Sequence, residues 1–232
     1  MDMRAEVWSP LQNASVWLGA WLYGHESTDD LLEAWGELGL DCDITLLSQV
    51  RSVARLDTCE PALRLVLSGP GEPPALPAGS EPSIAASRGD GAIVFDGSPA
   101  HALVDGTIYA IDQPLPAPQW LSPGDADRLL SDATNDAARL IEASGYRTDA
   151  LPNPRLTVGT LSDFYDTPGL PGSTPARAAK LFARADTVAA IVETVTQTMN
   201  DHSVDPQLLA LWRHIRAARM AGVAYAVRDF AR

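Results

Sequence analysis

The chain has few of the side chains that usually carry catalysis or hold metal ions. It contains four histidines and two cysteines among 232 residues. Two cysteines make no disulfide framework in a chain of this length. There is no Cys-x-x-Cys, and Asp29 takes the place of the second histidine that His25 would need for a His-Glu-x-x-His site. Gly-x-Ser-x-Gly, the P-loop and the dinucleotide fingerprint are missing too. We therefore assign no catalytic residue and expect no metal and no cofactor.

Positive charge is scarce as well. Lys180 is the only lysine, and 17 basic residues face 30 carboxylates, which gives a net charge of −13. Such a field repels phosphate backbones and anionic lipid headgroups, so neither nucleic acid nor a membrane is an expected partner. The most apolar stretch, Ala14 to Tyr23, is about half of the length that a membrane span needs. No signal peptide is recognisable at the start, and we expect a cytoplasmic protein.

The composition is that of a globular protein. Apolar residues make up 46% of the chain, close to the average of folded domains. Arginine takes 16 of the 17 basic positions and alanine is abundant, a bias that indicates a GC-rich bacterial genome rather than selection for arginine chemistry. The length suits one large domain. We expect residues 1–232 to form a single domain, with helices and strands in 1–118 and mostly helices in 119–232.

The first part of the chain carries three helix signals. Ser9, Ser27 and Asp43 are side chains that accept hydrogen bonds from the free N–H groups of a first helical turn, and apolar residues at helical spacing follow each of them. Gly24 and Gly39 stand where the first two helices should end. Short connections of this kind predict an antiparallel helix hairpin, followed by a third helix.

The apolar period then changes from 3.6 to 2, which predicts strands. In residues 63–67 leucines alternate with other residues, as in a strand with two different faces. Further on, Asp105-Gly106 separates residues 101–104 from residues 107–111, the sequence signal of a two-residue hairpin. The centre of the chain is therefore predicted to be an antiparallel meander.

The second part begins with a proline-rich connector. Residues 113–118 cannot form a regular ladder of hydrogen bonds and should be extended. Helices are predicted to start at Ser122-Pro123, Ser173-Thr174-Pro175 and Asp205-Pro206. The middle one has a heptad-like apolar face from Ala178 to Met199. These elements predict an α+β fold, in which a mostly antiparallel central sheet of about five or six strands is flanked by N-terminal and C-terminal helices.

Two segments of the chain resemble each other and suggest an internal pseudo-duplication. Arg64 and Arg155 each stand before a leucine in a predicted strand, and each strand leads through a Leu-Pro loop to a serine, Ser80 or Ser173, before a helix. If the halves are related, both helix N-termini would lie near both arginines, an arrangement suited to an anion or a small molecule. Coincidence is the alternative, because Pro, Gly and Ser dominate loops everywhere. Each serine would then simply cap its helix.

The tryptophans and the last helix form a second candidate site, a surface for binding a partner protein. Three arginines recur every third residue there, and small residues between them would let another backbone come close. The arginines either pair with the protein's own carboxylates or bind an acidic partner, which can be a second copy of the chain. Tryptophan is common in cores and in interface hot spots. The candidate interaction residues are Trp17, Trp21, Trp212, Arg213, Arg216 and Arg219.

His101 is the remaining candidate for chemistry. Asp96 and Asp105 are near it in sequence, and a carboxylate-oriented imidazole can act as a general base. Aspartates are equally expected at these turns for their geometry.

Two function classes stay open on these observations. The first is a non-catalytic protein that works through protein–protein contact, most simply as a homodimer. The second is a small-molecule or anion-binding protein, or an enzyme without a recognisable motif, whose site lies between the two Leu-Pro loops.

Overall fold

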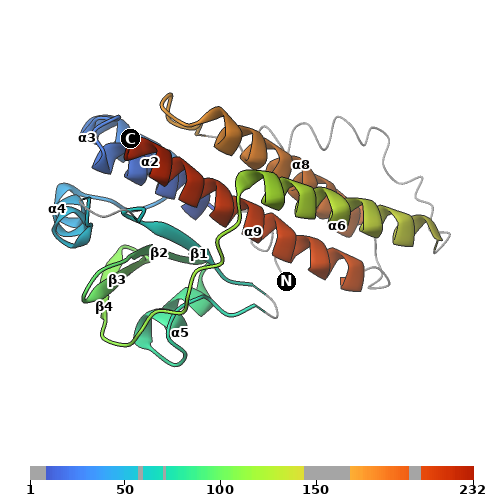
Figure 1. The fold of residues 1–232 in the computed structure, drawn as a ribbon, viewed down its shortest axis with the longest axis horizontal. Coiled ribbons are helices and arrows are strands. Elements are labelled where there is room, and N and C mark those ends of the chain that lie inside the picture. The colour runs from blue at the N-terminus through green and yellow to red at the C-terminus, as the bar shows by residue number, and fades with distance from the viewer. Residues whose placement is uncertain (1–8, 57–59, 70–71, 144–167, 199–204) are drawn as a thin grey trace.

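The computed structural model describes residues 9–56, 60–69, 72–143, 168–198 and 205–232. Within these ranges helices account for 56% and strands for 12% of the chain, so the predicted α+β class is confirmed. The elements in chain order are α2 (Leu11–Leu22), α3 (Thr28–Glu37), α4 (Ile44–Val53), β1 (Arg64–Leu67), α5 (Glu81–Arg88), β2 (Gly91–Phe95), β3 (Ala100–Val104), β4 (Thr107–Ile111), α6 (Pro123–Ala143), α8 (Ala176–Thr198) and α9 (Asp205–Phe230). Figure 1 shows the sheet below a layer of long helices.

Helices α3 and α4 begin where their capping residues predicted, whereas α2 begins at Leu11, after Pro10, which provides no side-chain cap. The Ser27 hydroxyl accepts the Asp30 N–H at 3.1 Å, and Asp43 Oδ1 accepts the Leu46 N–H at 2.7 Å. These bonds satisfy donors that a first helical turn otherwise leaves free. Helix α2 ends just before Gly24, whose φ of +79° is readily adopted by glycine alone.

The sheet is an antiparallel meander in the order β1-β2-β3-β4, as the alternating runs predicted. The β3–β4 turn places Asp105 and Gly106 at φ of +45° and +73°, the left-handed pair that an Asp-Gly hairpin turn requires. The described ranges contain four strands rather than five or six. The strand predicted at Arg155 lies outside the described residues, so only the Leu-Pro loop and Ser173 of the second repeated segment are described.

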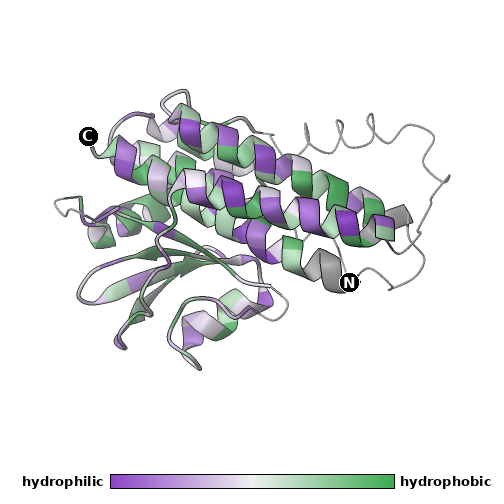
Figure 2. Ribbon diagram, turned by 45° about the vertical axis from the view of Figure 1, so that its right-hand side comes forward, coloured by the Kyte–Doolittle hydropathy of each residue, from purple (hydrophilic) through white to green (hydrophobic). Residues whose placement is uncertain are grey.

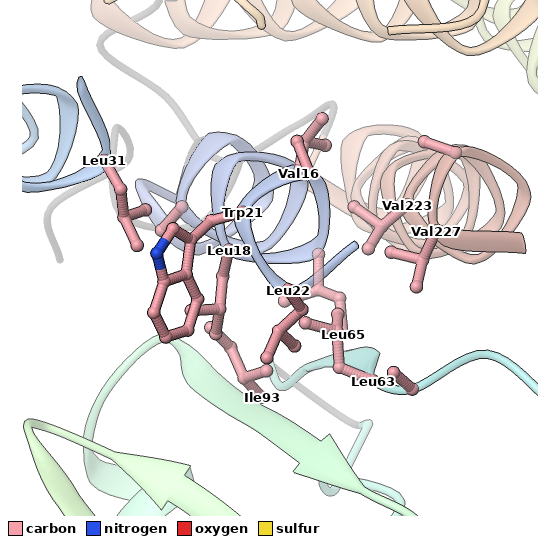
Figure 3. Packing of buried hydrophobic residues seen from close by; sticks show 14 of the residues in the cluster. Val16, Leu18, Trp21, Leu22, Leu31, Leu63, Leu65, Ile93, Val223 and Val227 are labelled. Carbon is pink, nitrogen blue, oxygen red and sulfur yellow. The ribbon is translucent and has the colours of Figure 1, made fainter. Parts of the chain in front are cut away.

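Both faces of the sheet are covered, so all four residues of β1 are buried. Leu65, Ile93 and Phe95 face the helical layer and belong to the main core, whereas Val66 and Val94 pack under α5 in a separate cluster. Figure 3 shows the main core from close by, with α2 and α9 next to each other on the same side of the sheet. Because both faces of β1 are buried, its leucines alternate with Arg64 and Val66 instead of with exposed polar residues.

The C-terminal helices α6, α8 and α9 lie side by side (Figure 1). The heptad-like face of α8 is buried among them at Ala178, Leu181, Ala185, Val188 and Val192, as its spacing predicted. Figure 2 shows hydrophilic and hydrophobic residues mixed along the visible face of this layer, as expected for helices that bury only one side.

Helix α9 connects the two parts of the chain. It packs against α6 and α8 and also against α2 and β1. The main core accordingly combines Leu18 and Leu31 from the N-terminal helices with Val223 and Val227 from α9 (Figure 3). The two parts therefore share one apolar cluster.

A buried polar network joins three helices at the centre of this contact. Arg219 of α9 has an exposed fraction of 1%, and its Nη1 donates hydrogen bonds to Asp186 Oδ1 of α8 at 2.7 Å and to Gln12 Oε1 of α2 at 2.5 Å. A buried ion pair is favourable only when its partners stay in place, since either charge left alone in the core is costly.

We expect Arg219→Met to lower the free energy of unfolding by about 3–5 kcal/mol, because Asp186 would stay buried without its cation. Denaturant unfolding measures this change. Arg139→Met is the control: Arg139 pairs with Asp136 but its side chain is 73% exposed, and such a pair contributes about 0–1 kcal/mol. Equal effects of the two substitutions would show that the buried network does not hold the helices together.

Candidate functional site

A cavity of about 250 Å³ lies between the sheet and the helical layer. We call it the junction pocket. Its walls are β1, the loop that follows β1, the proline-rich connector and one face of α9. The lining residues are Arg64, Leu65, Val66, Leu67, Glu72, Pro73, Ala75, Ala117, Pro118, Gln119, Trp120, Leu121, Ala217, Met220, Ala221 and Ala224.

The pocket exists because a strand edge meets a helix face of small residues. β1 is the first strand of the sheet, so one row of its backbone groups faces away from β2. The Leu67 N–H on that edge donates to the sulfur of Met220 at 3.4 Å. On α9, alanines at 217, 221 and 224 leave space where longer side chains would fill it. Most of the lining is therefore apolar.

Arg64 is the buried charge of the pocket. Its side chain is 8% exposed, and Nε lies 3.3 Å from Oδ2 of Asp96, which follows β2. This ion pair leaves the guanidinium undersatisfied, because Nε and Nη2 have no hydrogen-bond partner within the described ranges. Burial lowers the pKa of Arg64 while Asp96 acts to raise it. Burial likewise raises the pKa of Asp96, and Arg64 opposes that shift.

Other charges surround the pocket. Glu72 accepts hydrogen bonds from Nε and Nη2 of Arg216 at 3.2 and 2.8 Å, and Arg213 is 3.5 Å away from the same carboxylate. The guanidinium of Arg228 lies 5.0 Å from the ring centre of Trp120, a cation–π contact at the end of the connector. Trp120 is 51% exposed, so an aromatic side chain flanks the cavity.

Of the four residues predicted to bind an anion, the structure describes three, and these three lie in different places. Arg64 lines the junction pocket. Ser80 caps α5 by accepting the Ser83 N–H at 3.3 Å, and the Ser173 hydroxyl donates to Glu26 at 3.3 Å near the start of α8. Arg155 lies outside the described residues.

The two Leu-Pro loops belong to different parts of the core. Leu76 packs under α5, whereas Leu170 packs against the main core. Figure 1 places α5 and the start of α8 on opposite sides of the molecule. The two described loops therefore frame no common cavity.

The predicted interaction residues are mostly inside the protein. Trp21, Trp212, Arg216 and Arg219 are buried, and both arginines pair with the protein's own carboxylates. Trp17 is half-buried and donates its indole N–H to the Gly169 carbonyl at 2.9 Å. Arg213 is the exposed member of the set, with a side chain that is 67% exposed beside Glu72.

His25 has a structural hydrogen-bond partner, whereas the buried ring nitrogen of His101 has none among the described residues. Nδ1 of His101 is buried without a hydrogen-bond partner in the described chain, and Asp96 pairs with Arg64 instead. His25 Nε2 lies 2.9 Å from the Phe230 carbonyl, which can only accept, so this nitrogen carries the proton and caps the end of α9. No group of three His, Cys, Asp or Glu side chains that could hold a metal ion occurs among the described residues.

Several pocket residues escaped the reading of the sequence. Glu72 lies in a loop rich in Gly and Pro, and Ala217, Ala221 and Ala224 look like ordinary helix residues. Trp120 carried the one usable signal, a large aromatic residue directly after a proline-rich connector. Large aromatic side chains outside regular elements often mark contact sites.

The fold and the pocket define an α+β protein whose candidate site lies where its two parts meet. The Rv1486c-like family matches this chain in the same two parts, its N-terminal domain at residues 12–121 and its C-terminal domain at residues 124–220. The chain thus shares the domain order of the Rv1486c-like proteins.

Two curated relatives come from strains of Mycobacterium tuberculosis, and their names are Uncharacterized protein MT1533 and Uncharacterized protein Rv1486c. Each is 25% identical to this chain, over 94% of this chain and 96% of its own length. No solved structure matches the chain. Within the described ranges, no helix is both long and apolar enough to cross a membrane.

Partial burial disfavours ionisation of the Cys42 thiol. Burial raises its pKa to about 11, and the neighbouring Asp43 adds to the shift. The thiolate is the nucleophile, so Cys42 should react slowly with iodoacetamide near pH 7, and its rate should rise about tenfold per pH unit up to about pH 11. Mass spectrometry of a Cys59→Ala variant, in which Cys42 is the only cysteine, measures this rate. If the reaction rate instead reaches its plateau near the pKa of a free cysteine, the burial of the thiol is contradicted.

Proposed function

We propose that this protein binds a small, largely apolar molecule in the junction pocket. The observation that carries the proposal is the cavity itself, lined by β1, the connector and α9, with a buried arginine among mostly apolar residues. Ligand sites in proteins typically combine an apolar lining with a few convergent polar groups. This proposal keeps the binding class expected from the sequence and moves its site from the Leu-Pro loops to Arg64.

The size of the cavity limits the ligand. Its volume of about 250 Å³ falls just below the range of about 300–1,000 Å³ of pockets for drug-sized molecules. A small molecule with a short apolar body fits this space. Two walls of the cavity, β1 and α9, come from distant parts of the chain. A hydrogen bond from the Leu67 N–H to the Met220 sulfur joins them there.

The test uses 1-octanol as a neutral apolar probe and the methyl group of Met220 as the reporter. The chain has four methionines, so a spectrum with ¹³C-labelled methionine methyl groups is simple, and Met220→Leu assigns the signal. We expect a saturable shift of the Met220 signal on titration. Ala224→Phe should abolish the shift, because a phenyl ring there fills the pocket.

Ala138→Phe is the matched control, since it places the same ring on an exposed position of α6. It should bind the probe like the unaltered protein. If the Met220 signal does not respond to any probe, or responds equally in the Ala224→Phe variant, the junction pocket is not a ligand site.

Protein contact is a second candidate function, and a groove between α6 and α8 favours it. The groove has a volume of about 900 Å³ and is lined by Arg177, Lys180 and Arg184, with Ile191 39% exposed at its surface. Arg184 pairs with Asp127 at 2.7 Å. A cationic groove on a chain of net charge −13 suits an acidic partner.

A second copy of the chain offers such a surface. Helix α3 exposes Asp29, Asp30, Glu33 and Glu37. A contact between α3 of one copy and the α6–α8 groove of another would be heterologous, because it joins two different surfaces.

Native mass spectrometry tests this second function. We expect a dimer that Lys180→Glu weakens by about tenfold or more, since the substitution reverses a charge inside the contact. Arg139→Glu changes the net charge equally at a position outside the lining of the groove and should leave the dimer intact. A monomer at all concentrations would exclude self-association through this groove.

A further inference from the structure

The junction pocket lies along the edge of β1 rather than against one of its two faces. Four consecutive residues of the strand, Arg64 to Leu67, line the pocket. Side chains alternate between the faces of a strand, so a cavity on one face would meet only every second residue. Arg64 is opposite Val94, which packs under α5, whereas Leu65 packs in the main core on the other face. A cavity lined by all four residues therefore lies beside the backbone of the strand.

The hydrogen bonds of the strand show which backbone groups face this edge. In an antiparallel pair, every second residue exchanges both of its bonds with the neighbouring strand, and the residues between them point away from it. The Ser68 N–H donates to the Asp90 carbonyl at 3.3 Å, which places the even-numbered residues of β1 towards β2. Leu67 points the other way, since its N–H donates to the sulfur of Met220. The N–H and C=O of Leu65, two residues earlier, therefore also face away from β2, along the pocket.

The backbone of Leu65 has unused hydrogen-bonding capacity. Neither its N–H nor its C=O has a partner in the described part of the chain. Leu65 is 4% exposed, and backbone groups so deeply buried are rarely left unpaired in native proteins. The neighbouring Leu67 N–H has only a sulfur atom, which is a weak acceptor. A strand edge in this state is a template for the backbone of another extended chain.

A single amino-acid residue in extended conformation matches the edge at Leu65. The N–H and C=O of one extended residue lie on the same side of its chain, so they can exchange two hydrogen bonds with the residue opposite. The side chain of the added residue then points to the same face as that of Leu65, towards the helical layer. There, Ala221 and Ala224 of α9 leave space. The cavity of about 250 Å³ suits one such residue with a small group at each end rather than a long strand.

We infer that the junction pocket takes a small acylated amino-acid amide with an apolar side chain, whose N–H and C=O pair with the C=O and N–H of Leu65. This inference rests on the proposed function, since it names the class of ligand for the same pocket. The ligand adds one residue to the sheet beside β1 and buries its side chain against α9. All four paired groups are neutral, which agrees with a mostly apolar lining.

The probes are N-acetyl-leucine methylamide and its ester analogue, in which an oxygen replaces the leucine N–H. The two have nearly the same shape, but the analogue cannot donate to the Leu65 carbonyl. Titrations followed by the Met220 methyl signal should give about threefold to tenfold tighter binding of the amide. In ¹⁵N spectra the Leu65 amide proton should move downfield on saturation, because it gains an acceptor. A peptide with one further alanine on each side of the leucine should bind no more tightly.

A variant of the protein tests the other hydrogen bond. In it the α-hydroxy acid analogue of leucine replaces Leu65, so that an ester oxygen takes the place of the N–H while the side chain stays. Binding of the amide probe should weaken by about threefold to tenfold. The same exchange at Ala110, an exposed position on β4 at the far edge of the sheet, is the control and should leave binding unchanged.

The outcomes separate the inference from the proposed function. If the Leu65 variant does not fold, which circular dichroism shows, the response of the Leu65 amide proton in the unaltered protein decides. Equal binding of the two probes, an amide proton that does not respond, or much tighter binding of the longer peptide overturns the inference. The proposed function stands in each of these cases as long as 1-octanol shifts the Met220 signal. If no probe shifts that signal, the proposed function fails as well.

Discussion

The contact of Arg219 with Asp186 and Gln12 joins the two parts of this protein at the centre of their interface. Its three side chains come from α9, α8 and α2, and all are buried. Removing these charges from water is costly, so the contact contributes more to position than to stability. The donors and acceptors meet in one arrangement of the helices. That arrangement also sets β1 beside α9, where the junction pocket lies.

Helix α9 works as a shared wall because its faces differ in residue size. One face carries Val223 and Val227 into the main core, and Gly222 lets the ring of Phe182 come so close that a methyl group there would be only 2.3 Å from it. The pocket face carries alanines and leaves a cavity. The same helix is therefore tightly packed towards α8 and loosely packed towards β1.

The position of the pocket agrees with the two-part match to the Rv1486c-like family. β1 and the connector fall within residues 12–121, and α9 up to Met220 falls within residues 124–220. A ligand in the pocket touches both parts and would stabilise their contact by mass action. Ligand binding and the association of the two parts are thus thermodynamically linked in the proposed function.

Local signals in the sequence determined the elements, whereas contacts over long distances decided the site. The caps at Ser27 and Asp43, the Asp105-Gly106 turn and the heptad-like spacing of α8 act between residues three or four positions apart, so they can be read without a fold. Whether Trp21 and Trp212 are buried depends on what packs against them, and the sequence left both readings open. The pocket joins Leu67 to Met220 and Glu72 to Arg216, pairs separated by 153 and 144 residues. No local pattern marks such pairs, because only the packing of α9 against β1 brings them together.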